Sequence, residues 1–153
     1  KTAVLFAAAT RLGALLAGAD EATALALHDY GLNLGYAFQI ADDVLDYTAD
    51  AAELGKNLGD DLAEGKATLP LIHAIAHSAP AISERLKTII LDADTSAMPE
   101  VIAAIRATGG LDYSHARAVK FADKAMAALD GLPDSDHHDA LRGLARYAVE
   151  RSH

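Results

Sequence analysis

The chain has 153 residues and a formal net charge of −9, with 52% hydrophobic residues, 5% aromatic residues and no cysteine. The acidic balance argues against a nucleic-acid surface and against electrostatic attachment to anionic lipid, because both need clustered lysine and arginine. The lack of cysteine excludes disulfide and thiol chemistry and is compatible with a cytoplasmic location, and no apolar run reaches the roughly 18 residues of a membrane span.

The length fits a single domain, and its apolar content is mostly alanine and leucine, which are strong helix formers. Valine, isoleucine and threonine form no alternating runs of the kind that predict strands. We therefore predict an all-α domain of about seven helices, since the helical patterns between the Gly and Pro breaks number about seven. The chain opens directly inside a helical pattern, and we expect it to be part of a longer protein.

Two helices are predicted at the start of the chain. The first spans residues 2–16. Asp20 suits the N-cap of a second helix, which continues to about residue 48. Gly31 and Gly35 are four residues apart on this helix, where small residues either let a neighbouring helix approach closely or serve ordinary packing.

A polar, glycine-rich loop with room for a short helical turn is predicted over residues 49–67. Thr68 is expected to cap the next helix, which runs to about His77. The remaining predicted helices span residues 80–92, 97–108, 112–130 and 134–151.

The strongest chemical signal is a cluster of three aspartates. Asp42 and Asp46 are four residues apart on the predicted helix and Asp43 and Asp46 three apart, so they share one polar face, together with Gln39. Apolar residues surround them, and no lysine or arginine lies within a turn. The pattern fits either a solvated acidic face or a partly buried site for Mg²⁺, which prefers carboxylate oxygens.

The loop after the cluster favours the second interpretation. Lys56 and Lys66 lie among its glycines, in a chain that is otherwise poor in cations. Carboxylates followed closely by lysines suit a metal–diphosphate ligand, because the ammonium groups can contact phosphate oxygens. Lys1 and Thr2, at a helix start with available backbone N–H groups, would provide a further phosphate contact.

Two long segments carry a family resemblance. Residues 35–47, with the sequence GYAFQIADDVLDY, resemble the second aspartate-rich motif of the trans-isoprenyl diphosphate synthases. Residues 55–70 resemble the loop that follows this motif, most closely in the long-chain octaprenyl and decaprenyl synthases that make quinone tails. Lys1-Thr2 resembles the Lys-Thr pair upstream of the motif, and residues 110–113 and 144–151 resemble the end of the family's chains.

The resemblance implies a helical bundle of the isoprenoid synthase type, a homodimer, and condensation of isopentenyl diphosphate onto an allylic diphosphate with Mg²⁺. It implies that Asp42 binds the metal directly, that Asp43 and Asp46 bind mainly through metal-bound water, and that Asp61 orients water nearby. The residues expected to contact the allylic diphosphate are Lys1, Thr2, Gln39, Lys56 and Lys66. Among all these residues, Asp42, Lys56 and Lys66 are the ones expected to be catalytic.

The family also has a first aspartate-rich motif and basic residues for isopentenyl diphosphate, and neither occurs in this sequence. We therefore expect residues 1–153 to be the C-terminal part of a single polyprenyl synthetase domain, inactive by itself. A class I terpene cyclase is an alternative, but its second metal motif usually follows an Asn/Ser/Glu pattern. A non-catalytic accessory subunit of a heteromeric synthase is another, against which the complete cluster and both lysines argue.

His73 and His77 are expected to be structural or solvent-exposed, and a second histidine pattern is expected to lie at the surface. His73 and His77 lie four residues apart on one predicted helix and could bind Zn²⁺, but no third ligand follows at a motif spacing. Residues 136–139, with the sequence DHHD, are predicted to be a surface segment at a helix start.

Overall fold

The computed structural model describes residues 2–48 and 59–150, and every regular element in these two ranges is a helix. The all-α prediction is confirmed. The chain divides into two compact units. We call residues 2–41 and 116–150 the bundle unit, and residues 42–48 and 59–115 the motif unit. No helix within the described ranges is both long and apolar enough to cross a membrane.

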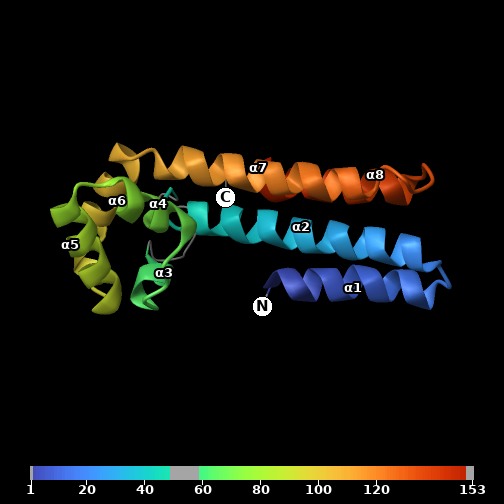
Figure 1. Ribbon diagram of the computed structural model, residues 1–153, viewed down its shortest axis with the longest axis horizontal. Helices are drawn as coiled ribbons and strands as arrows, with labels where there is room; N and C mark the ends of the chain where they lie inside the picture. The colour runs from blue at the N-terminus through green and yellow to red at the C-terminus, as the bar shows by residue number, and fades with distance from the viewer. Residues whose placement is uncertain (1, 49–58, 151–153) are drawn as a thin grey trace. The chain divides into compact units, whose positions relative to one another are not determined.

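The bundle unit consists of α1 (Thr2–Leu16), α2 (Glu21–Leu45) as far as residue 41, α7 (Gly110–Ala128) from residue 116, and α8 (Asp136–Glu150). These helices run alongside one another within the unit (Figure 1). The Tyr30 hydroxyl on α2 donates to the carbonyl of Leu141 on α8 at 2.8 Å. The core of the unit contains Tyr30, Leu34, Ala125, Leu129, Ala145 and Ala148.

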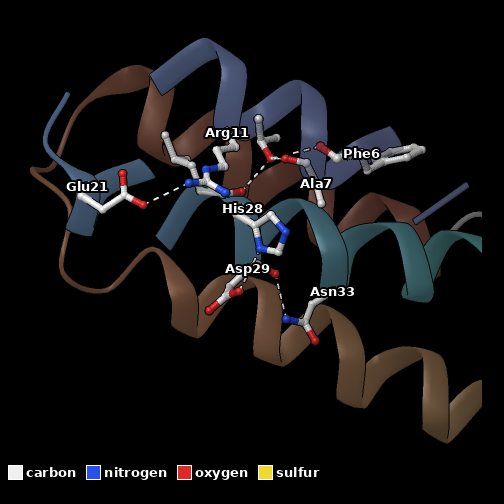
Figure 2. Close-up of polar contacts among 9 residues, drawn as sticks. Phe6, Ala7, Arg11, Glu21, His28, Asp29 and Asn33 are labelled. Atoms are coloured by element: carbon white, nitrogen blue, oxygen red, sulfur yellow. Dashed lines mark hydrogen bonds and ion pairs between the residues drawn. The ribbon is translucent and has the colours of Figure 1, made fainter. Parts of the chain in front are cut away.

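Helices α1 and α2 lie in close contact, as the two glycines of α2 allowed. A Cβ atom added at Gly35 would lie 2.5 Å from the Cα of Ala3, and one added at Gly31 would lie 2.6 Å from the carbonyl oxygen of Phe6. Polar contacts accompany this packing. Figure 2 shows one such contact at the surface, in which Arg11 Nη2 on α1 lies 3.0 Å from Glu21 Oε1 on α2. Close approach, rather than ordinary packing, explains both glycines.

The predicted start of α2 is confirmed, and its predicted end is wrong. Asp20 Oδ1 accepts a hydrogen bond from the Thr23 N–H at 2.8 Å, which caps the helix and lowers the pKa of Asp20. The helix ends at Leu45 instead of residue 48. The N–H of Tyr47 donates to the carbonyl of Val44 at 3.1 Å, three residues back, so the chain tightens into a turn there. Asp46 therefore lies just beyond the helix, not on it.

The motif unit contains α3 (Asp60–Ala63), α4 (Leu69–His77), α5 (Pro80–Leu91), the 3₁₀ helix η1 (Thr95–Ala97) and α6 (Met98–Ala107), with the ends of α2 and α7. Helix α4 packs against both α5 and α6. The buried core comprises Tyr47, Leu62, Leu71, Ala74, Leu86, Ile89, Ala97, Met98, Val101 and Ile105. The described ranges hold eight α-helices instead of about seven, because the short turn expected in the loop forms α3.

The last two helices begin at positions that local capping decides. Helix α7 begins at Gly110, two residues earlier than predicted, because Gly109 turns the chain at a φ of 70° and its carbonyl accepts from the Tyr113 N–H. Helix α8 begins at Asp136, two residues later than predicted, because the Ser135 hydroxyl accepts from the His138 N–H at 3.1 Å. Both shifts follow the residue that supplies the cap.

Candidate functional site

The aspartate cluster lies where α2 ends. Asp42 and Asp43 belong to the last turn of the helix, and the N–H of Asp46 donates to the Asp42 carbonyl at 3.2 Å in the turn that follows. No basic residue stands in that last turn. The negative end of the helix dipole and the repulsion between neighbouring carboxylates both disfavour these charges. The local structure therefore favours binding of a cation.

Lys66 supplies one such cation from within the motif unit. Its ammonium group donates to Asp43 Oδ1 at 2.9 Å and to Asp61 Oδ1 at 2.8 Å, where Asp61 stands in α3. The Asp43 side chain is only 10% exposed, so this ion pair is partly removed from water. Burial by itself would lower the pKa of Lys66, but the hydrogen bonds to Asp61 and Asp43 outweigh it and raise that pKa. Lys66 is therefore positively charged at any physiological pH.

Asp46 has a different environment. Its Oδ2 atom is buried and has no hydrogen-bond partner in the described part of the chain. Burial, followed by the charges of Asp61 and Asp60, raises the pKa of Asp46, although backbone N–H groups of Asp61 and Gly59 partly offset this. Buried carboxylate oxygens normally have a partner, so an oxygen without one points to an ion or a water at this position.

The donors at this end of α2 fit a hard divalent cation, but only as an incomplete set. Across residues 2–48 and 59–150, no three acidic or histidine side chains converge into a complete group of metal ligands. Mg²⁺ is usually held by one or two carboxylates, with water and substrate phosphates completing its coordination. The partnerless oxygen of Asp46, on a side chain that feels the charges of Asp61 and Asp60, is compatible with that mode of binding.

The structure thus brings together Asp43, Asp61 and Lys66, with Asp46 close to Asp61. Asp61 was expected near the cluster, and it lies there. Thr2 and Gln39 belong to the bundle unit, where Thr2 is the first residue of α1 and Gln39 is half-buried on α2. Lys1 and Lys56 lie outside the described residues. The assigned roles of all these residues stay predictions.

The histidines of α4 have structural partners. The rings of His73 and His77 stack at 4.0 Å, and His73 also stacks on Tyr113 at 4.3 Å. His73 Nε2 lies 3.1 Å from the carbonyl oxygen of Thr108 and must donate, because a carbonyl only accepts. These contacts join α4 to the end of α6 and the start of α7, which agrees with the predicted structural role.

The surface prediction for residues 136–139 is wrong for one residue. The His138 side chain is only 10% exposed, and its Nε2 lies 3.3 Å from the carbonyl oxygen of Leu129. This contact joins the start of α8 to the residue that directly follows α7. Because the partner lies nine residues away, the local pattern could not reveal it.

A family model described as polyprenyl synthetase matches residues 1–108. The chain belongs to the polyprenyl synthetase family. The octaprenyl diphosphate synthase of Escherichia coli K12 is 48% identical over 152 residues, which cover 99% of this chain and 47% of that enzyme. The chain thus spans about half the length of the curated relatives it matches.

Solved structures of the same family have the same fold. A polyprenyl synthase from Caulobacter crescentus CB15, complexed with calcium and isoprenyl diphosphate, matches with a TM-score of 0.88 and 48% identity, over 97% of this chain and 46% of that one. A decaprenyl diphosphate synthase from Rhodobacter capsulatus matches with a TM-score of 0.90 and 42% identity, over 100% of this chain and 48% of that one. The expected isoprenoid-synthase type of helical fold is confirmed.

Sequence reasoning missed one contact beside the cluster of this polyprenyl synthetase chain. Thr68 takes the N-cap position of α4 as predicted, but its side chain makes no capping hydrogen bond. Its hydroxyl instead shares a buried hydrogen bond of 2.8 Å with the hydroxyl of Tyr47. The capping pattern indicated the position of Thr68 correctly and gave no sign of this partner, 21 residues away.

Replacement of Asp46 tests its environment. Asp46 keeps its proton to a higher pH in the folded protein than in the unfolded chain, whose ordinary pKa is 3.8. Above both pKa values, ionisation of Asp46 therefore favours unfolding. We expect Asp46→Asn to raise the Tm of the full-length protein in chelator at neutral pH by a few degrees, since about 1 kcal/mol corresponds to roughly 2–4 °C. The gain should shrink as the pH falls toward about 4.

Thermal melts across this pH range provide the measurement. Asp123→Asn, at an exposed position on α7, is the control and should show no comparable pH-dependent gain. A lower Tm for Asp46→Asn at neutral pH would contradict the inferred burial of a charge that is only partly compensated.

Proposed function

We propose that the full-length protein is a polyprenyl diphosphate synthase that condenses isopentenyl diphosphate onto an allylic diphosphate with Mg²⁺. Residues 1–153 would be the C-terminal part of its single polyprenyl synthetase domain. The observation that carries this proposal is the carboxylate cluster at the negative end of α2, with Lys66 held between Asp43 and Asp61. Membership of the polyprenyl synthetase family supports it.

The chemistry needs groups that bind a departing diphosphate. When bound, Mg²⁺ would neutralise the negative charge that develops on the leaving group. An ammonium group has three donors, and Lys66 directs two of them to Asp43 and Asp61, so the third can serve a phosphate oxygen. The Caulobacter polyprenyl synthase is complexed with calcium and isoprenyl diphosphate, which supports binding of a divalent cation and a diphosphate ligand.

Asp42 is proposed as the direct ligand of Mg²⁺, with Asp43 and Asp46 binding mainly through its water ligands. Asp61 would orient water near the metal, a task that suits its position beside Asp43 and Asp46. The predicted diphosphate contacts of Lys1, Thr2, Gln39 and Lys56 are retained as part of this proposal.

A long-chain product of the kind used for quinone tails is also proposed, supported by the similarity to octaprenyl and decaprenyl synthases. The expected homodimer is retained as part of the proposal, and α1 exposes apolar side chains that either the rest of the domain or a second subunit would cover. Those exposed by more than half are Val4, Leu5, Leu12 and Leu16. Such a stripe favours burial against another protein surface. A cytoplasmic location remains a prediction.

Product analysis tests the proposed function directly. The full-length protein is incubated with labelled isopentenyl diphosphate and farnesyl diphosphate, and the products are separated by chromatography. We expect chains of about octaprenyl to decaprenyl length with Mg²⁺ and none after chelation, because the leaving group needs a metal. Shorter products would contradict only the chain-length proposal. Absence of any condensation product would contradict the proposed function.

A further inference from the structure

A buried pair of hydroxyl groups in the motif unit lies close in sequence to Asp46 and Lys66 of the candidate site. The side chains of Tyr47 and Thr68 share a hydrogen bond of 2.8 Å, and each residue is only 2% exposed. Tyr47 directly follows Asp46, and Thr68 comes two residues after Lys66. The hydrogen bond therefore joins the residue that follows Asp46 to a residue that lies two positions after Lys66.

The Thr68 hydroxyl binds Tyr47 instead of capping its own helix. Thr68 has the extended backbone of an N-cap residue, with φ −87° and ψ 163°, in which a threonine hydroxyl usually accepts from the first turn of its helix. It makes no such bond, so α4 lacks a side-chain cap. The Thr68 hydroxyl thus contacts Tyr47 instead of stabilising the helix end. Its hydrogen bond holds the backbone at Thr68 in place relative to Tyr47.

Tyr47 is suited to hold this position. Its ring belongs to the buried core of the motif unit together with Leu62 of α3 and Leu71 of α4. Its hydroxyl lies 2.8 Å from the Thr68 hydroxyl, and both residues are buried.

Lys66 gains most from this restraint. A lysine ammonium group lies at the end of a flexible four-carbon side chain. Fixing that group in one position therefore costs considerable conformational entropy. Lys66 Nζ nevertheless lies within 3 Å of carboxylates from two elements, at 2.9 Å from Asp43 and 2.8 Å from Asp61. Fixing the backbone two residues away at Thr68 reduces the freedom that remains to be lost.

We propose that Tyr47 and Thr68 are positioning residues, whose buried hydrogen bond keeps Asp46 and Lys66 in register and so places the Lys66 ammonium group for a diphosphate. This inference rests on the proposed function, because its consequence is a change in the handling of a diphosphate substrate. Neither hydroxyl is required to touch that substrate.

The first test compares two buried tyrosines in the full-length enzyme. Tyr30 is fully buried, donates one hydrogen bond of 2.8 Å to Leu141, and belongs to the bundle unit. We expect Tyr47→Phe to raise KM for the allylic diphosphate or lower kcat/KM by about 10- to 100-fold, as misplacement of a contact group commonly does. Tyr30→Phe, the matched control, should lower Tm and leave both kinetic constants near their wild-type values.

The second test changes the other hydroxyl. Thr68→Val should reproduce the kinetic change of Tyr47→Phe, and Thr68→Ser, which keeps the hydroxyl, should restore most of the wild-type kinetics. Thr108→Val is its control, because in the described part of the chain the Thr108 hydroxyl bonds to carbonyls of the helix it follows, those of Ala104 and Ile105. If Tyr47→Phe and Thr68→Val lower Tm and leave the kinetic constants unchanged, the pair is structural and the inference is wrong.

A third measurement applies even if the kinetic changes are small. Lys66→Met should lower Tm in the wild-type background, and by clearly less in the Tyr47→Phe background, because the hydroxyl pair and the ion pair are coupled. Additive shifts in Tm would overturn the inference. The proposed function would still stand in that case if the wild-type enzyme makes polyprenyl product. A wild-type protein that makes no polyprenyl product would overturn both.

Discussion

Asp42→Ala in the full-length enzyme is expected to lower kcat/KM for condensation by about 10³-fold or more. Asp42 is the proposed direct ligand of Mg²⁺, and its loss would remove several kcal/mol of charge stabilisation in the transition state, where about 4 kcal/mol corresponds to a factor of 10³. The fold should not suffer, because Asp42 lies in the last turn of α2. Alanine is the better helix former there, and it removes a charge from the negative end of the helix dipole.

Steady-state kinetics over a range of Mg²⁺ concentrations, together with circular dichroism, provide the measurement. Asp29→Ala is the matched control, because Asp29 lies on the same helix with its side chain 64% exposed. We expect this control to retain both turnover and helicity. Near-normal turnover of Asp42→Ala would show that the metal ligand had been assigned to the wrong residue.

Gly35→Val is expected to destabilise the protein by about 2–3 kcal/mol, as overpacking of a well-packed contact typically does. The added Cβ would lie 2.5 Å from the Cα of Ala3 and 3.3 Å from the Cβ of Phe6, both on α1. The obstructing Cα belongs to the backbone, so a rotamer change cannot relieve the contact. Helices α1 and α2 would have to separate, which would expose apolar surface between them.

Urea unfolding of the full-length protein measures this effect as a lower midpoint. Gly13→Ala is the control, because a Cβ at Gly13 on α1 meets no atom within 4 Å. That change should stabilise the protein by about 0.5–1 kcal/mol through helix propensity. Equal effects of the two substitutions would mean that glycine at position 35 serves helix propensity alone and not close packing.

Local chemistry made much of this structure predictable from the sequence. The first helix was predicted at residues 2–16 and the structure places it there, and Asp20 caps the second as expected. Helix caps, glycine turns and carboxylate spacing depend on atoms within a few residues, so a single sequence carries them. The aspartate cluster, the neighbouring lysines and the family resemblance belong to the same class of information.

Tertiary structure decided the partners of those residues. The sequence indicated that Lys66 would meet phosphate, and only the fold shows it between Asp43 and Asp61, 23 and 5 residues away in the chain. Thr68 was predicted from local pattern to cap a helix, and the fold turns its hydroxyl to Tyr47 instead. The reason is physical: a hydrogen bond between distant residues depends on how whole helices pack, and no pattern within one helix specifies that packing.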